Sequence, residues 1–293
     1  MSIRRNLGRA RLPGRPKLGR PSTTGLSGRL LVAVPGIILA IALIAIGGPA
    51  FTVGVAVIAA LALYEFYGLM AEYLPLRWAG YAGVLVFLVL AHVSGAAEAF
   101  AGGVAALLIL GAVAALRMER REEIMLRVAV TVLGGLYIGA PLATLVMLRG
   151  LPDIEGVTNL GAGAVANVVV GTWVFDTASY LGGKAWGTRP IAPVTSPRKT
   201  VEGFVVGLIG GVLAVWVAGL YMDWLLWYES LALGVVICLA AFAGDLFESL
   251  IKRDVGVKDS GRIMLSHGGV LDRFDALLFS APVAWIVTAY III

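Results

Sequence analysis

The chain has 293 residues, of which 59% are hydrophobic and only 14% are charged. Because soluble domains carry about 25% charged residues, this composition excludes an ordinary soluble globular protein. The chain is also too long to be a single membrane anchor, and it predicts an integral membrane protein with many spans.

Residues 1–29 form a basic arm that holds eight of the 23 Lys and Arg residues. Gly, Pro and Ser are mixed among them without an apolar period, so we expect disorder. The arm is typical of a positive-inside topology signal that also contacts anionic lipid headgroups. Nucleic acid is not expected as a partner because no aromatic residues alternate with the basic ones. The apolar run that follows is too long for a cleaved signal peptide, and the single Cys238 excludes a disulfide framework.

Nine apolar segments follow the arm, at residues 30–47, 51–70, 79–94, 98–116, 125–148, 162–182, 202–222, 225–246 and 274–293. Apolar runs of about twenty residues favour helices over the ten-residue alternation of a membrane barrel. We therefore expect an all-α polytopic membrane protein with about nine transmembrane helices. Its regions are the arm (1–29), N-terminal transmembrane helices (30–160) and a C-terminal transmembrane catalytic region (161–293).

The loops between these segments alternate in charge. If the arm is cytoplasmic, the basic loops 117–123, 184–200 and 247–273 fall on the cytoplasmic side, while the opposite loops carry little beyond Arg149. This asymmetry follows the positive-inside rule and predicts a cytoplasmic N-terminus and a C-terminus outside the cell membrane. All the chemically rich segments then face the cytoplasm, where nucleotides are found.

The sixth segment ends in DTASYLGGKAWG (176–187). Asp176 lies late in the span, Tyr180 follows one helical turn later, and the glycines loosen the end of the helix. An ionisable residue in a span is expected to face a protein interior or a watery cavity. We expect both side chains to line a cavity.

A second polar motif, SPRKTVEG (196–203), precedes the seventh segment. We expect a helix to begin there, with Ser196 as the N-cap and Pro197 in the first turn. Lys199 and Thr200 would then lie at a helix N-terminus, which is suited to bind a phosphate.

The stretch GDLFESLIKR (244–253) places four polar residues on one helical face, at positions i, i+3, i+4 and i+7: Asp245, Glu248, Ser249 and Lys252. Asp272 and Asp275 share a face at the start of the ninth segment. Carboxylates from two helices, without Cys or His, favour Mg²⁺, which also takes substrate phosphates as ligands. The alternative is a purely structural ion pair, in which Asp or Glu binds Lys at the membrane interface and no metal or substrate is bound.

These residues resemble the phosphatidate cytidylyltransferases, also called CDP-diacylglycerol synthases. The family signature corresponds here to Ser249, Lys252-Arg253, Lys258-Asp259, His267-Gly268-Gly269 and Asp272-Arg273-Phe274-Asp275. The segments 176–187 and 196–203 also resemble family motifs, so the likeness covers about residues 170–293. One departure is Met264-Leu265-Ser266, where family members usually have Leu-Pro-Gly.

The resemblance implies that CTP and phosphatidic acid react to give CDP-diacylglycerol and pyrophosphate. The expected cofactor is Mg²⁺, alone or together with a second cation. The candidate catalytic residues are Asp245, Lys252, Asp272 and Asp275. The candidate substrate-binding residues are Ser196, Lys199, Thr200, Ser249, Arg273, Asp176, Tyr180 and His267. The candidate metal ligands are Asp245, Asp272, Glu248 and Asp275.

Other functions stay open at this point. A CTP-dependent transferase with a different lipid acceptor would carry similar motifs, because acyl chains contact only generic apolar walls. An ion-coupled transporter could use Asp176, Asp245 and Asp272 as an ion path, although the charges gather at one interface. The sequence leaves the oligomeric state open, a homodimer included.

Overall fold

A computed structural model of the protein describes residues 26–118, 123–261, 263 and 268–293, with only the backbone described for residues 26–33. The helices are α1 Leu26–Ile46, α2 Gly48–Leu69, α3 Arg77–Val93, α4 Ala96–Leu116, α5 Ile124–Gly134, α6 Ala140–Arg149, α7 Leu160–Trp186, α8 Val201–Gly219, α9 Trp227–Asp254 and α10 Leu271–Val287. Shorter elements are the 3-10 turn η1 Ala71–Tyr73, the π-helical turns η2 Gly135–Gly139 and η4 Thr288–Ile292, and the strands β1 Pro190–Ala192 and β2 Ser196–Thr200.

Seven of the described helical segments are long and apolar enough to cross a membrane: Gly48–Leu69, Ala96–Leu116, Ile124–Arg149, Leu160–Trp186, Val201–Gly219, Trp227–Asp254 and Leu271–Ile292. Two apolar helices are shorter, namely Arg77–Val93 and the part of α1 whose side chains are described, Val34–Ile46. Each of the nine segments expected from the sequence overlaps a helix. The structure confirms an all-α polytopic membrane protein.

Helices α9 and α10 extend beyond the ranges expected from hydropathy, and both differences affect the polar residues. The segment expected at 225–246 is α9, which continues to Asp254, and the segment expected at 274–293 begins at Leu271. The apolar window stops short of the end of α9 and starts after the beginning of α10, because these terminal turns carry charged side chains. Lys252 therefore lies in the last turn of α9, and Asp272 lies in the first turn of α10.

The fifth span is a continuous helix that widens at its middle. A π-helical turn, η2, joins α5 to α6, and Pro141 is the second residue after it. Proline has no N–H to donate to the carbonyl of residue 137, and its ring would clash with that carbonyl in a regular α-helix. We attribute the wide turn to Pro141, and it places Tyr137 in the buried core.

Helices α7 and α8 pack closely because glycines line their contact. A Cβ atom at Gly203 would lie 2.7 Å from the Ser179 carbonyl oxygen, and one at Gly207 would lie 2.9 Å from the Phe175 carbonyl oxygen. Only glycine permits this approach of two backbones, as in the small-residue contacts of other membrane helices. The start of α8 is therefore held against the last turns of α7.

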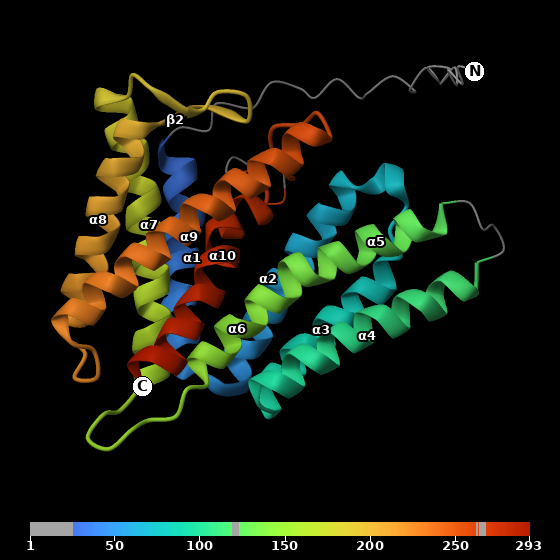
Figure 1. The fold of residues 1–293 in the computed structure, drawn as a ribbon, viewed down its shortest axis with the longest axis horizontal. Coiled ribbons are helices and arrows are strands. Elements are labelled where there is room, and N and C mark those ends of the chain that lie inside the picture. Colours follow the sequence, from blue (N-terminus) through green and yellow to red (C-terminus); the bar gives the residue numbers. More distant parts are fainter. Residues whose placement is uncertain (1–25, 119–122, 262, 264–267) are drawn as a thin grey trace, which may run out of the picture.

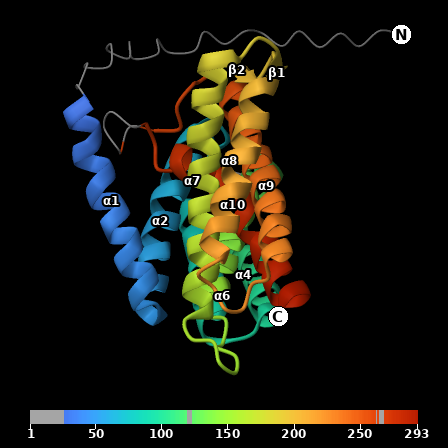
Figure 2. The ribbon, with the colours of Figure 1, turned by 90° about the vertical axis from the view of Figure 1, so that its left-hand side faces the viewer.

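The helices form two groups that meet along α9 and α10 (Figure 1). Helices α7 and α8 stand together on one side, and α3 packs against α4 on the other. Helix α1 lies at the outer edge of the molecule, next to α2 (Figure 2). The main core includes Phe66, Tyr67 and Phe87, whose side chains are fully buried.

The expected helix start at Ser196 is wrong. Residues Ser196–Thr200 form strand β2, which pairs with β1 in an antiparallel hairpin, and α8 begins only at Val201. The N-cap is Thr200, whose Oγ1 accepts a hydrogen bond from the Gly203 amide at 3.2 Å. The difference arises because residues 196–200 are extended and paired with β1, so the helix can begin only after Thr200.

Candidate functional site

A cavity of about 510 Å³ lies at the end of the bundle where α7 and α9 end and α8 and α10 begin, called the site end below. It is lined by residues from α7, β2, α8, α9 and α10, and its charged lining residues are Asp176, Lys184, Arg198, Lys199, Asp245, Asp272, Arg273 and Asp275. Both signs of charge therefore meet in one pocket. Such a pocket suits phosphate groups together with a cation.

The cavity brings together eight of the candidate residues: Asp176, Tyr180, Lys199, Thr200, Asp245, Asp272, Arg273 and Asp275. Four others do not line it, namely Ser196, Glu248, Ser249 and Lys252. His267 lies outside the described residues. The polar motifs of α7, β2, α9 and α10 thus converge on one pocket, although not every residue of each motif reaches it.

An ion pair crosses the cavity between β2 and α9. The Lys199 Nζ lies 2.7 Å from an Asp245 carboxylate oxygen, and both side chains are partly exposed. The ammonium group also lies 5.9 Å from the centre of the Phe242 ring, which packs against Phe204 with 4.6 Å between ring centres. Two phenyl rings therefore form an apolar wall directly beside the charged pair.

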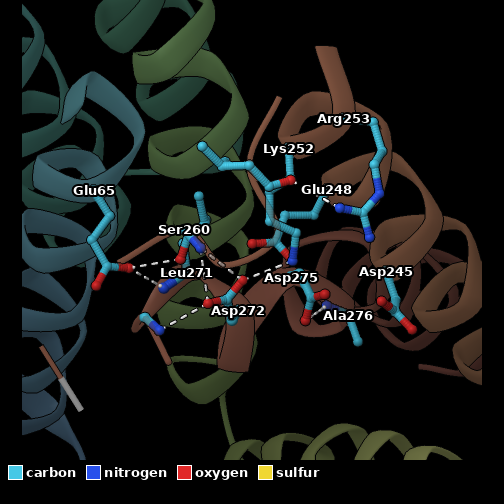
Figure 3. A network of polar contacts seen from close by, with 12 residues as sticks. Glu65, Asp245, Glu248, Lys252, Arg253, Ser260, Leu271, Asp272, Asp275 and Ala276 are labelled. Atoms are coloured by element: carbon cyan, nitrogen blue, oxygen red, sulfur yellow. Dashed lines mark hydrogen bonds and ion pairs between the residues drawn. The ribbon is translucent and has the colours of Figure 1, made fainter. Parts of the chain in front are cut away.

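Behind the cavity, Lys252 joins α9 to α10. Its Nζ lies 2.8 Å from Glu248 Oε2 and 2.7 Å from Asp272 Oδ1 (Figure 3). Glu248 is fully buried and Lys252 is 9% exposed, so both charges are largely removed from water. A buried ammonium group held between two carboxylates fixes the two helices relative to each other. The catalytic role expected for Lys252 stays a prediction, and in this structure its ammonium group is bound by the two carboxylates.

Asp272 also organises the chain that leads into α10. Its carboxylate accepts hydrogen bonds from the Gly269 amide at 2.8 Å and from the Ser260 amide at 3.0 Å. Gly268 has φ +83, in the left-handed region that glycine adopts without steric cost. With Lys252 included, Asp272 has three partners, and its position is tightly determined.

The acidic residues fit a magnesium ion, although they do not form a complete protein cage. Among the residues that the structure describes, no group of three or more His, Cys, Asp or Glu is arranged to hold a metal. Asp176, Asp245 and Asp275 nevertheless line the same cavity, and they offer only hard oxygen ligands. Magnesium commonly takes one or two carboxylates, several waters and substrate phosphates, so this donor set is appropriate.

The sequence interpretation missed the role of Glu65, which reaches the network from α2 (Figure 3). Its Oε2 accepts hydrogen bonds from the Leu271 amide at 2.8 Å and from the Ser260 hydroxyl at 3.1 Å. The side chain is 3% exposed. An acidic residue within an otherwise apolar span was the signal that could have identified it.

The fold and the cavity define a polytopic helical membrane protein with a phosphate-suited site at one end of its bundle. The sequence profile of the cytidylyltransferase family matches residues 27–291, and the chain belongs to this family. Membership agrees with the resemblance seen in the C-terminal motifs.

Curated relatives match part of the chain. Phosphatidate cytidylyltransferase from Thermotoga maritima is 41% identical over 135 residues, covering 44% of this chain and 50% of the relative. The enzyme of the same name from Staphylococcus saprophyticus is 44% identical over 115 residues, covering 38% and 43%. The uncharacterized protein YnbB from Escherichia coli is 44% identical over 132 residues, covering 43% of each chain. The aligned part of this chain thus spans half or less of these relatives.

Proposed function

We propose that the protein transfers a cytidylyl group from CTP to phosphatidic acid, giving CDP-diacylglycerol and pyrophosphate for phospholipid synthesis. The observation that carries the proposal is the cavity in which carboxylates and basic groups from α7, β2, α9 and α10 converge. Family membership and the names of the curated relatives support the same reaction. The proposal makes the protein a nucleotidyltransferase.

In this reaction a phosphate oxygen of phosphatidic acid attacks the α-phosphorus of CTP. A new P–O bond forms there, the bond between the α-phosphorus and the oxygen that leads to the β-phosphorus breaks, and pyrophosphate leaves with the bonding electrons. The attacking phosphate is anionic near neutral pH, so no strong general base is required. The protein then has to align two anionic substrates and to stabilise the developing charge.

The basic residues of the cavity would hold the phosphates. Lys199 and Arg273 are the principal candidates, and Lys184 and Arg198 line the same space. Thr200 caps α8 at the cavity, where backbone N–H groups of a helix N-terminus favour an anion. Lys199 pairs with Asp245 in this structure, so substrate phosphate would have to take the place of a carboxylate partner.

The carboxylates would hold Mg²⁺. Asp245 and Asp275 face the cavity, and Asp272 lines it while bound to Lys252. Buried Glu248 has one carboxylate oxygen, Oε1, without a hydrogen-bond partner among the described residues, and it would support this shell or a second cation. When bound, the metal would neutralise phosphate charge at the reacting centre.

We further propose that the chain spans the cell membrane nine times, with the N-terminus and the site end in the cytoplasm and the C-terminus outside. The basic residues of the site end, such as Lys184 and Arg198, support this orientation. The regions 1–29, 30–160 and 161–293 would serve as arm, scaffold and catalytic part. A homodimer is part of the proposal, to be tested by the mass of the detergent-solubilised protein.

The alternatives are a CTP-dependent transferase with another lipid acceptor and an ion-coupled transporter. Family membership disfavours the transporter. The three acids of the suggested ion path, Asp176, Asp245 and Asp272, also line one cavity at one end of the bundle. The polar contact between α7 and α10, Thr172 with Ser280, is uncharged. Different lipid acceptors would be distinguished by supplying each one with CTP to the purified protein and measuring which forms product.

The test supplies purified protein with labelled CTP, phosphatidic acid and Mg²⁺, and follows lipid-extractable cytidine and pyrophosphate release. We expect metal-dependent product in the wild type, loss of product after chelation, and rate losses of about 100-fold or more in Asp245→Asn and Asp272→Asn. Product retained in both variants would contradict their assignment as metal ligands and keep the proposed reaction. Product formed only with another lipid would reassign the acceptor.

A further inference from the structure

Glu65 is a buried acid in a part of the molecule that otherwise buries no charge. It lies on α2, a 22-residue apolar helix, and it is the only buried charged residue among the described residues of α1 to α6. An ionised side chain in such a helix is costly, and it persists where it binds specific partners. Its hydrogen-bond partners among the described residues are Ser260, in the segment that leads into α10, and Leu271, the first residue of that helix.

The first partner is the start of α10 itself. Leu271 is the first residue of this helix, and its amide donates to Glu65 Oε2 at 2.8 Å. The first amides of a helix have no acceptor within the helix, so Glu65 satisfies one of them from a different span. A carboxylate is also electrostatically favourable at a helix N-terminus.

The second partner is Ser260, which links Glu65 to Asp272. The Ser260 hydroxyl donates to Glu65 at 3.1 Å, while the Ser260 amide donates to Asp272 at 3.0 Å. Asp272 in turn binds Lys252 at 2.7 Å. A continuous chain of contacts therefore runs from α2 through the loop to α10 and α9.

Two glycines show how closely the chain wraps around this carboxylate. A Cβ atom at Gly269 would lie 2.8 Å from the Glu65 carboxyl carbon, and one at Gly261 would lie 2.6 Å from it. Both distances are shorter than carbon atoms tolerate without a shift. The second glycine of the His-Gly-Gly motif is thus required by a residue about 200 positions earlier in the chain.

We propose that Glu65 is a positioning residue, a hydrogen-bond acceptor supplied by the N-terminal helices that fixes the first turn of α10 and with it Asp272, Arg273 and Asp275. Its kinetic consequence rests on the proposed cytidylyl transfer. Its structural consequence, the ordering of Ser260 and Leu271, does not depend on the reaction.

The test compares Glu65→Ala with Glu65→Gln. Both hydrogen bonds go to Oε2, and Oε1 has no hydrogen-bond partner among the described residues, so a Gln carbonyl can replace the accepting oxygen. We expect kcat to fall at least about tenfold in Glu65→Ala, with KM for CTP changed less than about threefold, because misplaced groups slow the chemical step. Glu65→Gln should stay within about threefold of wild type.

Glu229→Ala is the matched control. Glu229 caps α9 at the opposite end of the bundle, where its carboxylate accepts from the Leu226 amide at 3.0 Å. The substitution removes a helix-capping glutamate that does not contact the site. We expect its kcat to equal that of the wild type.

Hydrogen exchange at the amides of Ser260, Gly269 and Leu271 tests the positioning role of Glu65 separately from the proposed cytidylyl transfer. Exchange should accelerate in Glu65→Ala but not in Glu65→Gln or Glu229→Ala, even if the wild type proves inactive with phosphatidic acid. Wild-type kcat and exchange in Glu65→Ala would overturn the positioning role. Glu65→Gln as impaired as Glu65→Ala would show that the negative charge, and not hydrogen bonding, is needed.

If Glu65→Ala does not fold, Ser260→Ala takes its place. This variant removes only the hydroxyl that donates to Glu65 and keeps the amide that binds Asp272. We expect kcat to fall by about threefold or more and exchange at residue 260 to accelerate. Unchanged kcat and exchange would contradict the proposal.

Discussion

The helices between Gly48 and Arg149 and those between Leu160 and Ile292 are both apolar, but they bury different side chains. The first region packs around large aromatic residues such as Phe66 and Phe87, and Glu65 is its only buried charge among the described residues. The second region buries Glu248, Lys252 and Asp275 at the site end. Buried charges occur where several elements supply partners, and this difference supports the proposal that the second region is the reactive one and the first its support.

The two regions also differ in how closely their backbones approach. In the first region Gly103 and Gly134 meet aromatic side chains of neighbouring helices, whereas in the second region Gly203 and Gly207 bring α8 against backbone atoms of α7. Close approach places Asp176 on α7 and Lys199 on β2 around the same cavity. Glycines in the second region thus contribute to the site by allowing close packing, although they carry no reactive side chain.

The largest effect is expected from Lys252→Met, which breaks the buried network of the second region. Glu248 and Asp272 would lose their shared cation, and removing one partner of a buried ion pair costs about 3–5 kcal/mol. We expect a lower unfolding temperature in detergent, followed by tryptophan fluorescence, together with loss of cytidylyl transfer. The two carboxylates are held 2.8 and 2.7 Å from the ammonium group in the native protein.

The control for this variant is Arg117→Met, in the first region. Arg117 is exposed at the C-cap of α4, and such surface changes usually stay within about 0.5 kcal/mol. Equal stability of the two variants would show that the buried network contributes nothing, and the contrast between the regions would fail.

Much of this contrast could be predicted from the sequence. Apolar runs locate the helices because a span must satisfy its backbone internally. The spacing of Asp245, Glu248 and Lys252 predicts a shared helical face, but not that Asp245 turns to Lys199 while Glu248 binds Lys252. Local periodicity describes one helix and carries no information on which neighbour each side chain meets.

Other features depend on contacts that no local pattern encodes. The Glu65 bond to Leu271 joins residues 206 positions apart. The hairpin before α8 was missed because SPRKT has the polar composition of a helix start, and its strand pairing depends on Pro190–Ala192. The wide turn before Pro141 arises because proline lacks a backbone N–H donor, and a hydropathy window does not detect this.

A smaller effect is expected from Gly207→Ala, which separates α7 from α8. The added methyl would meet the Phe175 carbonyl at 2.9 Å and contact the Ser179 hydroxyl. Overpacking of this kind costs about 1–3 kcal/mol, and the cavity between the helices should widen. We expect a lower unfolding temperature and a higher KM for CTP.

Gly68→Ala is the same substitution at an open position of the first region. A Cβ atom there would meet nothing within 4 Å, so the change should be neutral or stabilise α2 by up to about 1 kcal/mol. If Gly207→Ala were equally harmless, close packing of α7 and α8 would not be required for the site.

The smallest effect is expected from Arg149→Ala, which removes a cation at the end opposite the site. Arg149 donates to the Ile44 carbonyl at 2.7 Å and to the Ala45 carbonyl at 3.3 Å, so it satisfies orphan acceptors in the last turn of α1. Its loss should cost about 1–2 kcal/mol of unfolding free energy and leave kcat unchanged. Arg149→Lys should recover only part of the stability, because an ammonium group lacks the planar fork that reaches both carbonyls. A fall in kcat without a fall in stability would mean that α1 and its anchor communicate with the cavity, and the division into a supporting and a reactive region would have to be redrawn.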